Sequence, residues 1–260
     1  MIRVGVIGHG FIGAELVRRL AGATDLGLQV AFVHARRSDA AIPEALLLRD
    51  LDGFGDRGAD LIVEAAHPNV TRTHGARILG DSDYLPLSVT ALADDGLRAA
   101  MDAAAVASGH RLLLPHGALV GAGSLAEWRD QWRTVTFRME KPPMSLDLTT
   151  AGISVADIET RTVLHDGSVR SIAARFPRNV NAMVTGALAS IGLDRARGVL
   201  VADPALTELR LTVDARGRDG SRLRISRRQP AAGVSGTEMA ESAWASVLAA
   251  AGRQPAWSVV

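Results

Sequence analysis

The 260-residue sequence contains no cysteine. This absence excludes disulfides, thiolate metal ligands and cysteine nucleophiles, and it suits a reducing compartment, so we expect a cytoplasmic protein. No apolar run approaches the roughly 18 residues of a transmembrane helix, and the first residues resemble a strand rather than a secretory leader. We therefore expect no membrane partner.

Lysine is nearly absent: Lys141 is the only one, and the other 28 of the 29 basic residues are arginine. Genomic base composition is one explanation. The other is that position 141 needs an ammonium group, because lysine and arginine differ in shape and hydration. The formal net charge is only +1, which argues against nucleic acid as a partner. No His/Asp/Glu cluster has metal-ligand spacing, so no metal is expected.

The N-terminal segment carries the clearest motif. Val4, Val6 and Ile7 predict a short buried strand, Gly8-His9-Gly10-Phe11-Ile12-Gly13 follows it, and Ala14–Leu20 has helical apolar spacing. In a strand–turn–helix context, the pattern G-x-G-x-x-G lets the backbone approach a pyrophosphate at a helix N-terminus. We expect these six residues to bind a nicotinamide cofactor.

A second strand, Leu28–His34, ends where such folds choose between the two nicotinamide cofactors. An acidic residue there would bind the ribose 2′-hydroxyl of NAD. Positions 34–38 have no acid, and Arg36, Arg37 and Ser38 suit a 2′-phosphate. We therefore expect NADP to be preferred over NAD, although a solvated basic loop would look the same.

The remaining pattern predicts two domains. Short apolar strands alternate with helices up to Leu114, which predicts a parallel sheet, and the later strands follow one another closely, as in an antiparallel sheet. We expect an α/β fold with a Rossmann-type doubly wound parallel sheet over residues 1–118 and a second α+β domain with a mainly antiparallel sheet over residues 119–235. The expected strands are Asp60–Ala66, Tyr84–Val89, Arg111–Leu114, Val135–Met139, Thr160–Val163, Leu209–Val213 and Leu223–Ser226; the expected helices are Val70–Leu79, Asp94–Ala107, Leu125–Trp132, Ala182–Ser190 and Gly236–Ala251.

Smaller signals add detail. Asp219-Gly220 predicts a hairpin turn, and the arginines from Arg216 to Arg228 are interpreted as its solvated face. Asn69, Asp94 and Asn181 are candidate helix caps.

Several stretches together resemble the L-aspartate dehydrogenases of nicotinamide biosynthesis, over nearly the whole chain. They are Gly8–Gly13, Glu64–Pro68, Ser88–Asp94, Leu114–Leu119, Lys141–Leu146, Phe176–Asn181 and Val201–Pro204. The resemblance implies a Rossmann domain, a substrate domain that also makes dimer contacts, and a C-terminal helix (residues 236–260) that packs back on the Rossmann domain. It implies a homodimer and the reversible oxidation of aspartate to iminoaspartate with NAD(P).

One departure from that family concerns the chemistry. The family places its catalytic histidine about eight residues after the Asp-Pro step, where this chain has Leu211, and leucine cannot transfer a proton. A family serine is replaced by His116. Either another group has taken over the proton transfer, or the substrate is no longer aspartate.

Candidate site residues follow from these patterns. His116, at a predicted strand end, is the candidate acid–base group, and Lys141 is a second candidate catalytic residue. Lys141, Arg178, Asn179 and Asn181 offer the cations and amides that suit a dicarboxylate. Further cofactor contacts are expected at the carboxyl ends of predicted strands and in the turns that follow them: Ala65, Ala66, His67, Pro68, Thr90 and Ala91. His116 could equally be a turn residue without chemistry.

The sequence therefore predicts an NAD(P)-dependent oxidoreductase that interconverts a small, aspartate-like amino acid and its imine. The alternatives are an NADPH-dependent reductase of a different imine or carbonyl compound, and a cofactor-binding protein without turnover.

Overall fold

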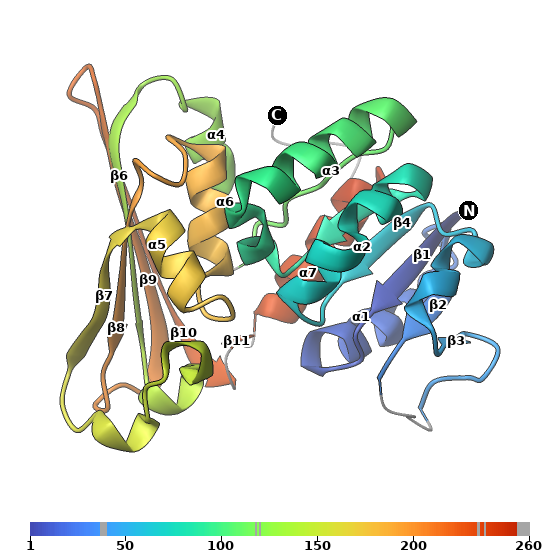
Figure 1. The fold of residues 1–260 in the computed structure, drawn as a ribbon, viewed down its shortest axis with the longest axis horizontal. Coiled ribbons are helices and arrows are strands. Elements are labelled where there is room, and N and C mark those ends of the chain that lie inside the picture. Colours follow the sequence, from blue (N-terminus) through green and yellow to red (C-terminus); the bar gives the residue numbers. More distant parts are fainter. Residues whose placement is uncertain (37–40, 118, 120, 233–234, 237, 254–260) are drawn as a thin grey trace. The chain divides into compact units, whose positions relative to one another are not determined.

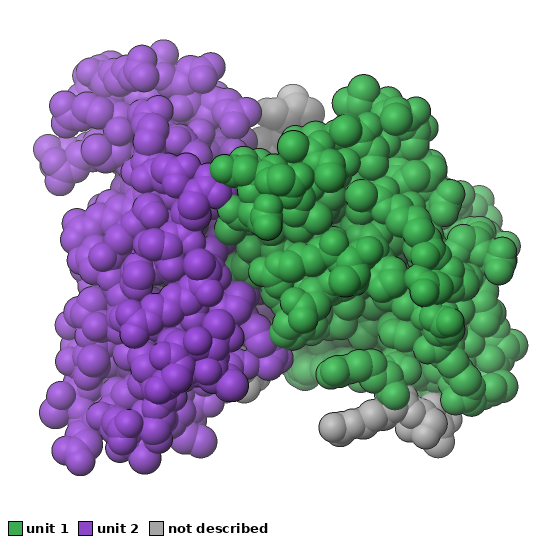
Figure 2. Space-filling view, viewed as in Figure 1, with its two compact units in different colours: residues 1–115, 240–260 green, residues 116–239 purple. Residues whose placement is uncertain are grey.

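The computed structural model describes residues 1–36, 41–117, 119, 121–232, 235–236 and 238–253. The chain divides into two compact units, shown in different colours in Figure 2. Unit 1 comprises residues 1–115 and 240–260, and unit 2 comprises residues 116–239. Within the described ranges, every helix is too short or too polar to cross a bilayer.

Unit 1 contains a parallel five-stranded sheet in the order β3-β2-β1-β4-β5 (Figure 1). The strands are β1 (Ile2–Ile7), β2 (Leu28–His34), β3 (Leu47–Leu48), β4 (Leu61–Glu64) and β5 (Asp83–Pro86). The helices are α1 (Phe11–Ala21), α2 (Pro68–Asp81), α3 (Asp95–Ser108) and α7 (Met239–Ala250). The predicted Rossmann-type sheet is confirmed, and the second strand has the predicted bounds.

The order of these strands explains where a ligand can bind. From β1 the chain adds β2 on one side and later β4 on the other, so right-handed crossovers place α1 and α2 on opposite faces of the sheet. The point where the order reverses, at the carboxyl ends of β1 and β4, is the usual ligand position in such sheets. The turns after β1 and β4 are therefore the expected position of a ligand-binding site.

The core of unit 1 joins segments that are far apart in the sequence. Val4 and Val6 of β1, with Leu16 of α1, pack in one buried cluster with Ala243 and Val247 of α7. A hydrogen bond also joins these segments: Nη2 of Arg111 donates to the carbonyl oxygen of Ala250 at 2.9 Å. The last described helix thus completes the core of the first described strand.

Unit 2 contains a six-stranded sheet in the order β11-β10-β9-β6-β8-β7. Only β6 and β8 pair in parallel, so the predicted mainly antiparallel sheet is confirmed. The strands are β6 (Trp132–Lys141), β7 (Thr162–Ser168), β8 (Arg197–Ala202), β9 (Glu208–Gly217), β10 (Arg222–Ala232) and β11 (Ser235–Gly236), and the helices are α4 (Ala122–Glu127), α5 (Val169–Arg175) and α6 (Asn181–Ala189).

The helices of unit 2 cover one face of this sheet. A Cβ on Gly198 of β8 would lie 2.8 Å from Ile172 of α5 and 3.2 Å from Met183 of α6, so the helices approach the strands closely. The predicted turn at Asp219-Gly220 joins β9 to β10, with Gly220 at a φ of +88°. The hairpin is confirmed.

Two element predictions are wrong. Arg111–Leu114 forms only an isolated bridge between Leu112 and Tyr84, because Pro115 has no N–H to continue a ladder. Leu125–Trp132 is not one helix: α4 ends at Glu127, and Trp132 begins β6 with its Nε1 donating to the carbonyl oxygen of Leu125 at 3.1 Å. Aromatic residues favour strands, which accounts for the second error.

Of the three predicted helix caps, only Asp94 is confirmed, with its carboxylate accepting from the N–H of Leu97 at 3.0 Å. The cap of α2 is His67, not Asn69, since the His67 Nδ1 accepts from the N–H of Asn69 at 3.1 Å. The cap position of α6 is Val180, and Asn181 is already inside the helix.

Candidate functional site

The glycine loop lies between β1 and α1, as predicted. Gly10 occupies the N-cap position of α1, where no side chain satisfies the first N–H groups, and the first turn carries no acidic residue. A helix N-terminus with free N–H groups and no acid favours an anion. The side chain of Phe11 beside it is 60% exposed.

The three glycines of the motif have different reasons to be glycine. Gly8 has a φ of +101°, and a Cβ there would lie 2.7 Å from the carbonyl oxygen of Ala65. A Cβ on Gly13 would collide with the carbonyl oxygen of Gly8. A Cβ on Gly10, in contrast, would meet nothing within 4 Å. The described residues do not require glycine at position 10, whereas a pyrophosphate on the backbone there would.

Glu64, at the end of β4, fixes the turns beside this loop. Its side chain is fully buried, and its carboxylate accepts from the N–H groups of Ala66 and His67, both at 2.7 Å. It also accepts from the N–H of Ser88 at 3.1 Å and from the hydroxyl of Ser88 at 3.0 Å. Burial raises the pKa of Glu64, and these four hydrogen bonds oppose part of the shift. One carboxylate thereby joins the turn after β4 to the turn after β5.

Other predicted cofactor contacts lie in the same turns of unit 1. Pro68 is buried as the first residue of α2, and Ala66 is exposed in the turn before it. Thr90 and Ala91 lie in a buried 3-10 turn after β5. Arg36 is exposed just after β2, whereas Arg37 and Ser38 lie outside the described residues.

In unit 2, Lys141 is the last residue of β6 and is only 4% exposed. Burial lowers the pKa of its amine to about 8, and the negative charge of Glu238 opposes part of this shift. A cation is rarely buried in this way without a specific role, and an amine with a pKa near neutrality can both give and accept a proton.

Lys141 and Leu211 lie on the same face of the sheet. Met139 of β6 pairs directly with Leu211 of β9, and Lys141 comes two residues after Met139 on the same face. Such diagonal neighbours in an antiparallel pair are about 7–8 Å apart, which a lysine side chain can span. The only lysine can therefore reach the space beside the leucine that stands where the resemblance implied a histidine.

A charged pair adjoins this position. Arg227 of β10 pairs directly with Leu211, and its Nη2 lies 3.9 Å from Oε1 of Glu238. Both carboxylate oxygens of Glu238 are buried, and neither accepts a hydrogen bond from the part of the chain that the structure describes. A buried carboxylate without a donor is costly, so this one suits a ligand that brings a donor. We call Lys141, Arg227 and Glu238 the charged cluster.

The predicted dicarboxylate contacts are engaged within the protein. Asn179 is 4% exposed; its Oδ1 accepts from the N–H of Asp147 at 2.9 Å and its Nδ2 donates to the Asp147 carbonyl at 2.6 Å. Arg178 pairs with the Asp147 carboxylate at 2.6 Å. Both residues thus brace the loop around Asp147. Asn181 is partly exposed at the start of α6.

His116, the acid–base candidate of the sequence, is the first residue of unit 2 and is exposed. Its carbonyl accepts from the N–H of Leu119 at 2.9 Å. No group of three or more His, Asp or Glu side chains among the described residues is placed to hold a metal ion.

Sequence reasoning missed Glu64, Ser88, Arg227 and Glu238. Glu64 lies in the stretch Glu64–Pro68 that carries the family resemblance, but only the fold shows that its carboxylate is buried. Arg227 was assigned to the solvated face of the hairpin, yet its side chain is only 26% exposed. Its alternation with exposed Arg224 and Arg228 was the available signal, because neighbours on a strand face opposite sides.

Comparison with known proteins matches both units. Residues 8–115 match the family described as "Homoserine dehydrogenase, NAD binding domain", and residues 124–251 match "Aspartate dehydrogenase, C-terminal". A protein of Bordetella pertussis named "L-aspartate dehydrogenase 1" is 34% identical over 93% of this chain and 95% of its own length. An "Aspartate dehydrogenase domain-containing protein" of Danio rerio is 34% identical over 96% of this chain and 95% of its own length.

A solved structure gives the same result for the fold. The aspartate dehydrogenase of Thermotoga maritima superposes with a TM-score of 0.76, covers all of both chains and is 23% identical. The two relatives named above are each 34% identical to this chain over 95% of their own length, which establishes the family. The chain belongs to the aspartate dehydrogenase family, with a nicotinamide-binding domain in unit 1.

Proposed function

We propose that this protein is an NAD(P)-dependent oxidoreductase that interconverts a small, aspartate-like amino acid and its imine. The observation that carries the proposal is the buried charged cluster of unit 2, which combines a proton-transferring amine with a cation and a carboxylate that suit an amino acid. Relatives named L-aspartate dehydrogenase support the same class of substrate.

The residues of unit 1 fit a nicotinamide cofactor. Gly10 leaves open space at the N-terminus of α1, and Glu64 holds the turns after β4 and β5. A bound nicotinamide would accept or supply the hydride, and the protein orients the reacting carbon and manages protons. We propose NADP as the preferred form, since Arg36 follows β2 with no acid beside it.

Replacing Arg36 by alanine tests this preference. The dissociation constant of NADPH is expected to rise about tenfold while that of NADH changes little, because only NADPH carries the 2′-phosphate. Fluorescence titration of each cofactor measures both constants. Equal weakening would contradict the preference for NADP.

We propose that Lys141 acts as the acid–base group. In the direction of oxidation, the neutral amine at Nζ would accept the proton that leaves the substrate ammonium; in reduction, the ammonium would return it. Burial supplies the neutral form near pH 8. The register of β6 and β9, with Lys141 diagonal to Leu211, supports this role, because the resemblance implied an imidazole at position 211.

Glu238 and Arg227 would hold the substrate. The unsatisfied carboxylate of Glu238 suits the substrate ammonium, and the guanidinium of Arg227 suits a carboxylate through paired hydrogen bonds. Residues Arg178 and Asn179 would contribute indirectly, because they fix the loop at Asp147.

The test follows absorbance at 340 nm with NADPH and NADH separately, using oxaloacetate plus ammonia, and the reverse reaction with L-aspartate. Wild type should turn over, and Lys141→Met should lose at least ~100-fold in kcat with unchanged cofactor affinity. Leu211→His is the matched companion on the same sheet face. A gain of more than ~10-fold from that histidine, or an active Lys141→Met, would contradict the role of Lys141.

Leu211 itself supports a second candidate, a reductase of a different imine or carbonyl compound. Silence with aspartate and oxaloacetate but oxidation of NADPH with another small imine would favour it. Tight NADPH binding without turnover on any imine or amino acid would instead favour a cofactor-binding protein.

We also propose a homodimer in the cytoplasm. Light scattering on the purified protein tests the dimer, and a monomer would contradict it.

A further inference from the structure

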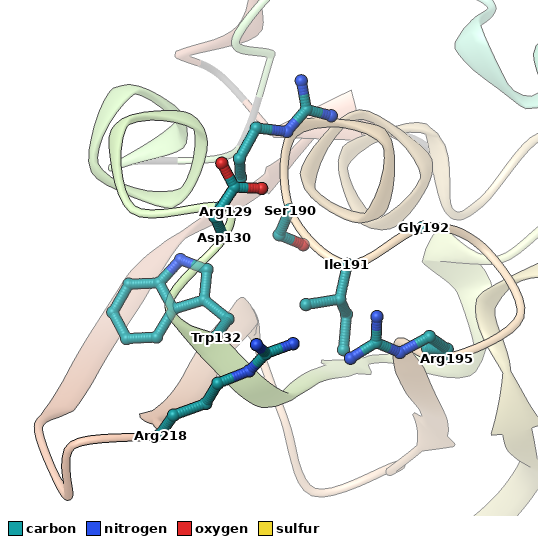
Figure 3. Close-up of a pocket in the computed structure, with 8 residues that line it drawn as sticks. All are labelled: Arg129, Asp130, Trp132, Ser190, Ile191, Gly192, Arg195 and Arg218. Carbon is teal, nitrogen blue, oxygen red and sulfur yellow. The ribbon is translucent and has the colours of Figure 1, made fainter.

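A pocket of about 680 Å³ opens in unit 2 (Figure 3). Its lining includes no residue of the charged cluster. It is lined by residues that follow α4, by the loop between α6 and β8, and by the turn after β9. The lining residues are Arg129, Asp130, Trp132, Ser190, Ile191, Gly192, Arg195 and Arg218.

Two arginines face each other across this pocket. In Figure 3 the guanidinium groups of Arg195 and Arg218 point toward one another below Ile191, whereas that of Arg129 points away. Arg129 donates instead to the carbonyl oxygen of Leu188 at 3.2 Å. Two like charges that converge repel each other, so the arrangement favours an anion between them.

Asp130 also lines the pocket, but no ion pair joins its carboxylate to either arginine in the described part of the chain. Arg195 and Arg218 each have an aspartate as sequence neighbour, and both aspartates are turned elsewhere. Asp194 pairs with Arg170 at 2.6 Å, and Asp219 accepts from the N–H of Ser221 at 3.0 Å. Within the described ranges, neither Arg195 nor Arg218 forms an ion pair. Other arginines of unit 2 do pair with an acid, for example Arg197 with Asp166 at 2.6 Å.

Main-chain hydrogen bonds fix the backbone beside both arginines. The N–H of Arg218 donates to the carbonyl oxygen of Gln131 at 2.9 Å, and the turn that carries Arg195 is closed by a 3.0 Å bond from the N–H of Ala196 to the carbonyl of Gly192. Trp132 is 2% exposed and stacks on Trp128 with 5.6 Å between ring centroids. Gly192, at a φ of +86°, leaves open space where a side chain would stand. The backbone that carries the two arginines is therefore well defined on both sides of the pocket.

We propose that this pocket binds a small dianion, a phosphate ester or a dicarboxylate, through the guanidinium groups of Arg195 and Arg218. Each planar guanidinium can donate two parallel hydrogen bonds to either kind of group. The volume accommodates a metabolite larger than a bare ion. All eight lining residues belong to unit 2.

The test is calorimetric titration of the full chain with inorganic phosphate and, separately, with succinate, with NADPH already bound. At least one anion should bind with a dissociation constant below about 1 mM. In the double variant Arg195→Gln/Arg218→Gln that constant should rise at least ~10-fold. The control is Arg133→Gln/Arg222→Gln, two exposed arginines of the same unit outside the pocket, which removes the same charge. Circular dichroism confirms that each variant is folded.

The two anions separate the ligand classes: phosphate alone indicates a phosphate ester, and succinate alone a dicarboxylate. Absence of binding by either anion at about 10 mM would overturn the proposal. So would an equal loss in the control variant, which would indicate general electrostatic attraction. Binding that appears only when NADPH is omitted would place the anion at the cofactor loop instead.

Discussion

Gly10 and Gly13 lie in the same motif but are expected to respond differently to alanine. Alanine at 13 collides with the Gly8 carbonyl oxygen, so the free energy of unfolding should fall by about 1–3 kcal/mol. Alanine at 10 meets no atom of the residues that the structure describes, and the φ of −86° at this position suits any residue. The free energy of unfolding of the Gly10→Ala variant should therefore differ from that of the wild type by less than ~0.5 kcal/mol.

Cofactor binding completes this comparison. The Gly10→Ala variant should bind NADPH at least ~10-fold more weakly, since the added methyl occupies space that the pyrophosphate would take. Thermal unfolding and fluorescence titration measure the two effects. Normal NADPH binding by Gly10→Ala would contradict the placement of the pyrophosphate on this backbone.

Lys141 should make stability depend on pH in the alkaline range. Its pKa falls from 10.5 to about 8 in the folded state, so the unfolded chain binds more protons between these values and stability rises with pH there. The free energy of unfolding of the wild type, relative to Lys141→Met, should increase by about 3 kcal/mol from pH 8 to pH 10.5. Urea unfolding of both proteins across this range measures it. A flat difference would mean that the amine titrates normally.

At the scale of elements, Asp94 is expected to stabilise α3 through its cap. Asp94→Ala removes the acceptor for the N–H of Leu97 and should lower the free energy of unfolding by about 1 kcal/mol. Asn69→Ala is the control, since Asn69 lies in the first turn of α2 without capping it. Its cost should stay below ~0.5 kcal/mol. Equal losses in urea denaturation would show that the cap contributes nothing specific.

Most elements of unit 1 could be predicted because local pattern and final structure agree there. The β-branched run before Gly8 and the alternating apolar segments each have one stable arrangement, a buried strand followed by a helix. Errors occurred where distant contacts decide. Trp132 belongs to a strand because it pairs with Gly217 of β9. Arg197–Ala202 was not recognised as a strand although it is nearly fully buried.

The candidate site was predictable only in part, for a related reason. A glycine loop is a local signal, so its residues could be named from the sequence. The charged cluster forms because β6, β10 and the residue before α7 come together, and no spacing in the sequence encodes that meeting. Lys141 could be named because it is the only lysine, whereas Glu238 and Arg227 carry no such mark.

At the scale of the whole molecule, unit 1 should not fold stably without α7, its last helix. A chain ending at Met239 loses Ala243 and Val247 from the cluster that contains Val4 and Leu16. NADPH binding should be lost, although α7 contributes no residue to the glycine loop. A chain ending at Arg253 keeps α7 and is the control. Fluorescence titration and proteolysis of both chains provide the measurement, and tight NADPH binding by the shorter chain would contradict this view of the core.

The discontinuity of unit 1 also has a consequence for synthesis. Unit 2 is one uninterrupted stretch between the two parts of unit 1, so a ribosome would deliver all of unit 2 before α7 emerges. During that interval the cofactor domain has an open apolar face that α1 alone cannot cover. Chaperones that hold nascent chains recognise such surfaces, and a prematurely released chain would keep one. Cofactor binding would thus report that translation has reached α7.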